Sequence, residues 1–391
     1  MKDASVGVYV HVPFCERICP YCDFAVVAAR RLPAERATRY TDALLRELER
    51  RRDAFSGRRL ASLYFGGGTP SLLPPEEVAR LVAAVRGAFA SDAPVETTLE
   101  LNPGSLERER LPGFRDAGVN RLSVGAQSFD DTALRRLGRA HRAAEVWRTL
   151  AACREAGFAS VGLDLIFGAP GQTRAGLEAD LARAVGFGPE HVSAYELSLE
   201  PGTPFAAAAT RGRLALPDED ALVAMHARVE ERLSAAGYAR YEISSYARPG
   251  FEAVHNRRYW ERRPVLGLGM GAVSLDPPGE GAPFGVRRPN HRQLDAYLEA
   301  VESGRPAESA EVEVLSAERA RGEAFFLALR TLRGLDAAAF AAEFGASPRG
   351  FRAGAIDALL GAGLLREAPD GDLCLTARGR MLSDSVFAEL V

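Results

Sequence analysis

The sequence predicts an α/β fold over its first two thirds, and two observations carry that prediction. Short apolar runs alternate along the chain with amphipathic helical patterns. Glycine-rich, cysteine-rich or polar signals follow these runs at their carboxyl ends, where parallel α/β folds build their sites. Strands that alternate with helices imply right-handed βαβ units and a parallel sheet, which is either an open doubly wound sheet or a partial barrel.

The individual elements follow from this alternation. The strand candidates, in chain order, are Gly7–Val12, Leu60–Phe65, Thr97–Leu101, Arg121–Gly125, Val161–Phe167 and Val192–Leu197. Between them, apolar residues recur with a helical period. The helix candidates are Ala34–Phe55, Pro75–Phe89, Leu106–Ala117, Ala143–Ala156 and Arg174–Val185.

The pattern changes after about residue 240. A segment His255–Trp260 and a glycine-rich run, Gly267–Gly271, precede a helix over Arg292–Ser303. A compact tail of helices then leads to a hairpin pattern over Leu364–Cys374, and helices followed by a short hairpin resemble a winged helix. We therefore expect an α/β domain over 1–238, a connecting segment over 239–310 and a winged-helix-like domain over 311–391.

The composition limits the possible classes of protein. With 391 residues, 47% of them hydrophobic, the chain can form one large domain and a smaller one. Its 49 basic and 52 acidic residues give a net charge of -3. This balance does not predict binding to nucleic acid or to an anionic membrane. The apolar runs suit neither a secretory signal nor a membrane span, so we expect a cytoplasmic protein whose clustered cysteines serve a metal or redox site.

Three cysteines form the motif Cys15-x-x-x-Cys19-x-x-Cys22. A structural zinc site normally takes four protein ligands, and no fourth cysteine or well-placed histidine is nearby, since His11 lies on the first strand. Three thiolates suit a [4Fe–4S] cluster with one iron open to an exogenous ligand. With this spacing, that ligand is usually S-adenosylmethionine (SAM), whose cleavage by the reduced cluster releases a 5′-deoxyadenosyl radical.

The alternative is a set of incidental buried thiols, because cysteine is a common core residue. Three cysteines within eight residues make that alternative weak for the motif. Cys153 lies on an apolar helical stretch and Cys374 in the C-terminal hairpin, so we expect both to be core residues.

A glycine-rich loop, Gly66–Pro70, lies between the second strand and the next helix. Glycines let the backbone approach a ligand and expose amide and carbonyl groups to it. Alone, the loop is equally well a tight turn between strand and helix. One βα unit behind the cysteine motif, it predicts a binding loop for the methionine end of SAM.

Polar residues at later strand ends extend this candidate site. Glu100 ends the third strand, where a carboxylate can bind an ammonium group or ribose hydroxyls, and Gln127, Arg139 and Asp164 follow in the next two units. Each has a plainer alternative: Arg139 as a solvated helix residue, or Asp164 as a cap for neighbouring backbone. We expect these residues to lie on the same face of the sheet, which favours a binding role over the plainer alternatives.

Five motifs along the chain occur together in one known family. They are Tyr9–Cys22, Gly66–Pro70, Glu100–Pro103, Gly125–Phe129 and Asp164–Gly168. They resemble the oxygen-independent coproporphyrinogen III oxidase family of radical SAM proteins, over nearly the whole chain. The resemblance implies a partial (β/α)6 radical SAM barrel with a small C-terminal winged-helix-like domain, and a low-potential electron donor such as flavodoxin or ferredoxin.

The resemblance also implies roles for single residues. By position in the motifs, the residues that contact cluster-bound SAM are Tyr9, Gly67 and Glu100. The positions that serve a second SAM in the oxidase are Gly68, Thr69, Gln127, Arg139 and Asp164.

Two departures distinguish this chain from the oxidase. Oxidases carry another cysteine two residues after the third, where this chain has Phe24, and a long N-terminal arm, whereas fourteen residues precede Cys15 here. Both features resemble the haem chaperone branch of the family. That branch also carries a segment like His255-Asn256-Arg-Arg-Tyr259-Trp260.

This segment can be interpreted in two ways. His255 can ligate haem iron while Asn256 fixes the imidazole and Tyr259 and Trp260 flank the porphyrin. The alternative is a buried polar turn that only packs the C-terminal domain. The family resemblance favours the first interpretation.

The function predicted from the sequence is therefore that of a haem chaperone that binds SAM and haem or porphyrin and passes haem to an unidentified protein. The runner-up is coproporphyrinogen III oxidation, in which the radical abstracts hydrogen from propionate side chains before decarboxylation. A cluster-sensing DNA-binding regulator comes third, because Arg319 and Arg321 lie between Glu318 and Glu323 and give a solvated face. We expect neither a nucleic-acid partner nor a membrane span.

Overall fold

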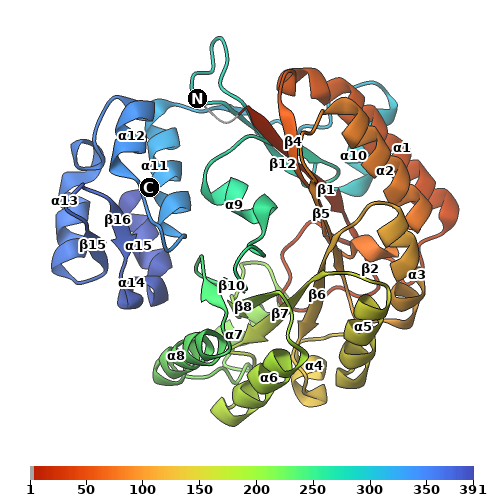
Figure 1. Cartoon of the computed structure of the whole chain (residues 1–391), viewed down its shortest axis with the longest axis horizontal. Coiled ribbons are helices and arrows are strands. Elements are labelled where there is room, and N and C mark those ends of the chain that lie inside the picture. The colour runs from red at the N-terminus through yellow and green to blue at the C-terminus, as the bar shows by residue number, and fades with distance from the viewer. Residues whose placement is uncertain (1–3) are drawn as a thin grey trace.

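The computed structural model describes residues 4–391, and a curved sheet forms its centre (Figure 1). Parallel neighbours follow one another in the order β11-β1-β4-β5-β6-β7-β8. Their bounds are β1 Ser5–Val12, β4 Arg59–Gly67, β5 Glu96–Leu101, β6 Arg121–Gln127, β7 Ser160–Phe167, β8 His191–Glu196 and β11 Val265–Leu268. The strands predicted from the sequence are confirmed, and so is the parallel α/β fold.

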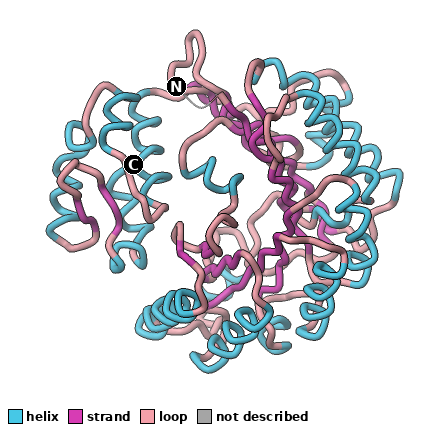
Figure 2. The backbone as a smooth tube through the Cα atoms, viewed as in Figure 1, coloured by secondary structure: helices cyan, strands magenta, loops and turns pink. Residues whose placement is uncertain are grey.

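Helices cover the convex side of this sheet, as Figures 1 and 2 show. They are α1 Ala34–Arg51, α2 Pro75–Ala88, α3 Ser105–Asp116, α4 Asp131–Arg136, α5 Ala143–Glu155, α6 Arg174–Phe187, α7 Pro204–Thr210 and α8 Glu219–Ala235, with short 3₁₀ turns at Arg52–Phe55 and Pro70–Leu72. Side-chain caps start several of them. Thr173 accepts a hydrogen bond from the Gly176 amide at the start of α6, and Asp218 accepts one from Ala221 at the start of α8.

The segment over 239–310, expected as a connection, contributes strands to the same sheet. Its glycine-rich run begins as β11, which pairs in parallel with β1 on the side away from β4. A Cβ at Gly267 would lie 2.7 Å from the Val273 carbonyl, so glycine lets the next strand pack this closely. Antiparallel strands extend both edges: β12 Val273–Asp276, β13 Val286–Pro289 and β14 Glu313–Val314 on one side, β10 Ser245–Ala247 and β9 Ala239–Arg240 on the other.

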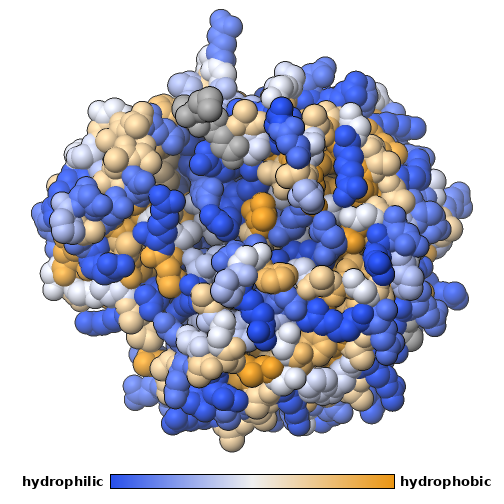
Figure 3. Space-filling model, in the orientation of Figure 1, coloured by the Kyte–Doolittle hydropathy of each residue, from blue (hydrophilic) through white to orange (hydrophobic). Residues whose placement is uncertain are grey.

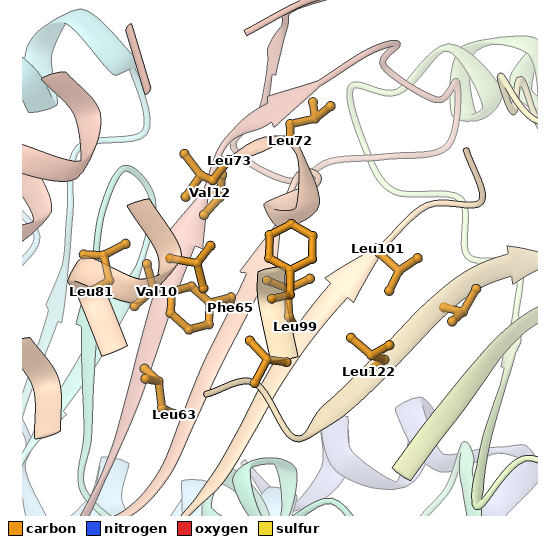
Figure 4. Close-up of a cluster of buried hydrophobic side chains, with 14 of the residues drawn as sticks. Val10, Val12, Leu63, Phe65, Leu72, Leu73, Leu81, Leu99, Leu101 and Leu122 are labelled. Atoms are coloured by element: carbon orange, nitrogen blue, oxygen red, sulfur yellow. The ribbon is translucent and has the colours of Figure 1, made fainter. Parts of the chain in front are cut away.

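The core lies between the sheet and its outer helices (Figure 4). Val10 of β1, Leu63 of β4 and Leu99 of β5 are fully buried there, with Leu81 of α2 packed in the same cluster. Burying each such side chain contributes roughly 1.5–3 kcal/mol. Because strand side chains alternate between faces, the intervening residues of these strands point to the concave side, where the site lies.

A second hydrophobic cluster holds the C-terminal elements together. They are α11 Ala317–Leu329, α12 Ala337–Phe344, α13 Pro348–Gly361, β15 Leu365–Glu367, β16 Leu373–Leu375, α14 Ala377–Met381 and α15 Ser383–Leu390, with α10 Leu294–Glu302 preceding them. The predicted hairpin is present, and Gly371 adopts a φ of +90° in its turn. Cys374 in the hairpin and Cys153 in α5 are buried, as expected for core residues.

The part of the chain that the structure describes contains no helix that is long and apolar enough to cross a membrane. On the face seen in Figure 3, hydrophilic residues dominate and apolar ones lie in small separate groups.

Candidate functional site

The carboxyl ends of the central strands surround a cavity of about 380 Å³. It lies among the cysteine motif, the glycine loop after β4 and the ends of β5 to β8. The sequence-predicted residues that line it are Cys15, Cys19, Cys22, Gly67, Gly68, Thr69, Glu100, Gln127, Arg139 and Asp164. The structure therefore brings most of the residues predicted for the cluster and SAM to one place.

The cysteine motif lies on a loop that is fixed at both ends. Two short strands, β2 (Phe14–Cys15) and β3 (Val27–Ala28), pair in parallel, and the Ala29 amide donates to the Cys15 carbonyl at 2.7 Å. Inside the loop, the Cys22 amide donates to the Cys19 carbonyl at 3.1 Å. All three motif cysteines are free and half-buried, so their thiols are available as ligands.

The chemistry of these thiols suits a polynuclear cluster. Burial raises the pKa of Cys15 to about 11, so its thiolate needs a nearby positive charge such as a metal supplies. Within residues 4–391, no three His, Cys, Asp or Glu side chains converge tightly enough to hold a single metal ion. Iron–sulfur clusters are held by cysteine thiolates, so the residue type of the motif fits such a cluster.

Two glycines of the loop after β4 leave no room for a side chain. Gly67 has a φ of +108°, and a Cβ there would lie 2.5 Å from the His11 ring. A Cβ at Gly68 would lie 2.8 Å from the Phe14 carbonyl oxygen and 2.9 Å from the Cys15 sulfur. Only glycine lets this backbone lie directly against the cysteine loop, where a ligand of the cluster would be held.

Glu100 is half-buried at the end of β5, and both of its carboxylate oxygens accept hydrogen bonds. The Tyr64 hydroxyl donates to Oε1 at 2.7 Å, and the Gly67 amide donates to Oε2 at 3.2 Å. Burial, together with the nearby Asp164, raises the pKa of Glu100 to about 7. A cationic or hydroxyl group of a ligand would favour the ionised form of this carboxylate.

Asp164 and Gln127 lie across the cavity on β7 and β6. Asp164 accepts a hydrogen bond from the Ser123 hydroxyl at 2.9 Å, and burial raises the pKa of its carboxyl. Gln127 adopts a φ of +63°, in the left-handed region that non-glycine residues seldom occupy. Strained backbone of this kind is concentrated at ligand sites, which is consistent with a binding role for Gln127.

Arg139 connects the cysteine loop to the strand ends. Its Nη1 donates to the Cys19 sulfur at 3.4 Å, and its Nη2 donates to the Gly125 carbonyl at 3.2 Å and to the Asn102 side chain. The plainer alternative of a solvated helix residue is therefore wrong. Arg139 therefore holds a positive charge beside the cysteine loop.

Sequence reasoning missed four residues of the cavity and its wall: Tyr21, Tyr64, Asn102 and Ser123. Asn102 donates to the Thr69 hydroxyl at 2.9 Å, and Tyr64 holds Glu100. Strand alternation could have identified two of them, because Tyr64 lies two residues before the glycine loop and Ser123 two before Gly125.

Tyr9 lies outside the lining of the cavity. Its ring stacks on Tyr64 with centroids 6.1 Å apart, and its hydroxyl lies 3.1 Å from His11 Nδ1. The contact between Tyr9 and SAM that the resemblance implies stays a prediction.

The segment His255–Trp260 forms most of α9 (Val254–Trp260), on the concave side of the sheet (Figure 1). The Glu96 carboxylate, at the start of β5, accepts from the His255 amide at 3.0 Å. Arg258 donates to the Ser5 hydroxyl, at the start of β1, at 2.7 Å. This helix therefore contacts the amino-terminal ends of the strands, opposite the cysteine motif.

His255 is enclosed in this position. Its Nδ1 lies 2.9 Å from the Ser62 hydroxyl and its Nε2 lies 3.3 Å from the Tyr259 hydroxyl. The ring stacks on Tyr64 at 5.1 Å and is 1% exposed, and burial lowers its pKa to about 3. The interpretation of His255 as a haem ligand does not fit this geometry, because both ring nitrogens are occupied and the helix turns the ring into the barrel.

The neighbours of His255 fit the alternative interpretation. Trp260 lies 4.5 Å below the Arg330 guanidinium, which follows α11, and Asn256 is half-buried on the same helix. α9 thus packs the barrel against the C-terminal domain, as expected of a buried polar segment.

Comparison with known families agrees with this architecture. Residues 9–184 match the model of the radical SAM superfamily, and residues 315–382 match the model of the HemN C-terminal domain. Among solved structures, coproporphyrinogen III oxidase (HemN) from Escherichia coli superposes with a TM-score of 0.82 at 26% identity, over 99% of this chain and 90% of that one.

Curated relatives extend over the full length of the chain. The heme chaperone HemW of Bacillus subtilis is 34% identical over 383 residues, which cover 97% of this chain and 98% of that protein. The heme chaperone HemW of Mycobacterium tuberculosis is 39% identical over 394 residues, covering 100% of this chain and 96% of its own length.

Proposed function

Because the chain belongs to the HemW family within the radical SAM superfamily, we propose that it is a haem chaperone with a [4Fe–4S] cluster on Cys15, Cys19 and Cys22. Membership of the superfamily implies the cluster and SAM. The haem proposal rests on one observation: this chain matches a relative named as a heme chaperone over 98% of that relative's length.

The residues around the cavity support a specific division of roles. A bound cluster supplies the electron that cleaves the sulfonium of SAM. The backbone of Gly67 approaches the ligand, Glu100 accepts hydrogen bonds from its ammonium or hydroxyl groups, and Arg139 connects the cysteine loop to the strand ends. We assign any second SAM to the group Gly68, Thr69, Gln127, Arg139 and Asp164.

Coproporphyrinogen III oxidation is the second candidate, favoured by the similarity of the whole fold to HemN. Phe24 argues against it. This residue is 61% exposed at the rim of the cavity, at the position where the resemblance to the oxidases calls for a further cysteine. The phenyl ring offers no thiol at this position.

A DNA-binding regulator has less support. Arg319 pairs with Glu313 at 3.4 Å, and Arg321 donates to the Phe344 carbonyl at 2.9 Å. These two cations of α11 are therefore engaged within the protein, and the helix start offers no phosphate-binding stripe.

Anaerobic reconstitution of the protein with iron and sulfide, followed by two assays, tests the proposal. Titration with haem should give a spectral shift. Incubation with coproporphyrinogen III, SAM and a low-potential reductant should give no protoporphyrinogen. The C19A variant, which lacks a cluster ligand, gives the amount of product that forms without an intact cluster. Robust, cluster-dependent product formation would overturn the chaperone proposal in favour of the oxidase, and absence of haem binding would remove its basis.

The same preparation can identify partners. We propose a low-potential donor such as flavodoxin or ferredoxin as the source of electrons, and a separate haem-receiving protein.

A further inference from the structure

A group of three aromatic rings lies on the concave side of the sheet. Tyr9 of β1 and Tyr64 of β4 are neighbours across the two strands, and their ring centroids are 6.1 Å apart. The ring of His255 in α9 contacts both, with its centroid 5.1 Å from that of Tyr64 and 6.2 Å from that of Tyr9. Aromatic rings at such distances restrict one another's orientation in addition to burying apolar area.

Tyr64 connects this group to Glu100. Its hydroxyl donates to Glu100 Oε1 at 2.7 Å, and the orientation of the ring decides where that hydroxyl lies. The glycine loop after β4 packs on the same rings, because a Cβ at Gly66 would lie 2.9 Å from both Tyr64 and Tyr9. The position of the Tyr64 ring therefore affects the carboxylate and the loop that are expected to hold SAM.

Tyr9 connects the group to the cysteine loop through His11. The Nε2 of His11 lies 2.8 Å from the Ala25 carbonyl, three residues after Cys22. A carbonyl only accepts hydrogen bonds, so Nε2 carries the proton and Nδ1 accepts from the Tyr9 hydroxyl at 3.1 Å. A Cβ at Gly67 would lie 2.5 Å from the His11 ring. His11 therefore contacts both the loop that carries the cluster ligands and the loop that approaches SAM.

His255 is itself fixed to the strands that carry these residues. Its Nδ1 lies 2.9 Å from the hydroxyl of Ser62, which is on the same strand and the same face as Tyr64. Its amide donates at 3.0 Å to Glu96, at the start of the strand that carries Glu100. Burial lowers the pKa of His255 to about 3, so the ring is neutral at physiological pH and adds no charge near Glu100. Any effect of His255 on that carboxylate is therefore one of position.

We propose that His255 is a positioning residue for SAM, which acts through Tyr64 on Glu100 and through Tyr9 on His11. The ring of His255 keeps both tyrosine rings in the orientation in which their hydroxyls meet Glu100 and His11. The inference deepens the proposed function, and it rests on the cluster and SAM of that proposal and not on haem.

Equilibrium dialysis of SAM against the reconstituted full-length protein, with iron analysis, tests the role of the ring. H255A should raise the dissociation constant for SAM roughly 2- to 12-fold at unchanged iron content, the range that loss of one aromatic pair produces. H255F keeps a ring against Tyr64 and should restore most of the affinity. H255N can still hydrogen-bond Ser62 but has no ring, and should behave as H255A does.

Two further variants separate positioning from a general loss of packing. Y64F lacks the hydroxyl that donates to Glu100 and should also weaken SAM binding. The double variant H255A/Y64F should bind SAM more tightly than the product of the two single effects, because both changes act on the same contact. W260L, at the end of α9 that contacts Arg330, should leave SAM affinity unchanged. Thermal unfolding followed by circular dichroism confirms that each variant is folded.

The outcomes separate the inference from the proposed function. Wild-type SAM affinity in a folded, iron-loaded H255A protein would overturn the inference, and so would equally weak binding by H255F and H255A. If W260L weakens SAM binding as much as H255A does, docking of the helix in general causes the effect and His255 has no positioning role. If the effects of H255A and Y64F multiply, the two residues act independently and the inference is wrong. In each of these cases the proposed function stands, whereas a wild type with a full cluster that binds no SAM contradicts both.

Discussion

Replacement of Glu100 by glutamine tests how the cavity holds SAM. The carboxylate is half-buried and accepts hydrogen bonds from Tyr64 and Gly67 at 2.7 and 3.2 Å. Glutamine keeps the size of the side chain but removes its charge and one acceptor. Hydrogen bonds to charged groups contribute about 1.5–3 kcal/mol. At 1.4 kcal/mol per factor of ten, the dissociation constant for SAM should rise roughly 10- to 150-fold.

The pH dependence gives the same test a second readout. Because burial raises the pKa of Glu100 to about 7, its carboxyl is increasingly protonated as the pH falls below that value. The protonated form cannot pair with an ammonium group, so SAM affinity should fall about tenfold per pH unit below 7. The E100Q variant should lose this dependence.

Equilibrium dialysis of SAM against the reconstituted protein, with iron and sulfide analysis, measures the effect. Iron content should not change, because Glu100 is not a cluster ligand. E47Q is a matched control: burial also raises the pKa of Glu47 to about 7, but this residue hydrogen-bonds Gly269, Asn290 and Tyr297, away from the cavity. Unaltered SAM affinity in a fully iron-loaded E100Q protein would refute the reasoning.

The remaining predictions concern the cluster, the loop and the buried acid. C19A should lose the charge-transfer absorbance of the cluster while C153A keeps it, and a full iron complement in C19A would exclude Cys19 as a ligand. G67A should abolish SAM binding with little loss of iron, since its Cβ would lie 2.5 Å from the His11 ring; wild-type SAM affinity in G67A would show that this close approach does not matter. Between about pH 4.3, the ordinary value for Glu, and pH 7, the folded state binds an extra proton at Glu47, so unfolding free energy should fall as pH rises there. Denaturant unfolding of E47Q should show a weaker slope, and an identical slope would mean that Glu47 does not titrate in this window.

The sequence could predict which of these residues lie together because of their places in the fold. The cysteine motif, the glycine loop and Glu100 each follow a strand, and parallel strands bring their carboxyl ends to one edge of the sheet. The central strands were recognisable because each apolar run is short and is followed by glycine-rich, cysteine-rich or polar residues. β11 was missed because its glycines hide the strand pattern, and its pairing with β1 joins residues far apart in the chain.

The enclosed position of His255 could not be predicted, for a different reason. The residue types in its segment suit haem, but residue type does not reveal which way a short helix faces. Contacts with Ser62 and Glu96, both distant in sequence, turn the ring into the barrel.

Electron paramagnetic resonance of the reduced, reconstituted protein tests the central claim most directly. We expect a [4Fe–4S] signal that changes on addition of SAM, because Cys15, Cys19 and Cys22 leave one iron open. At the same SAM concentration, E100Q should show the same initial signal and a smaller change. A cluster signal that SAM does not alter in the wild type would contradict the account.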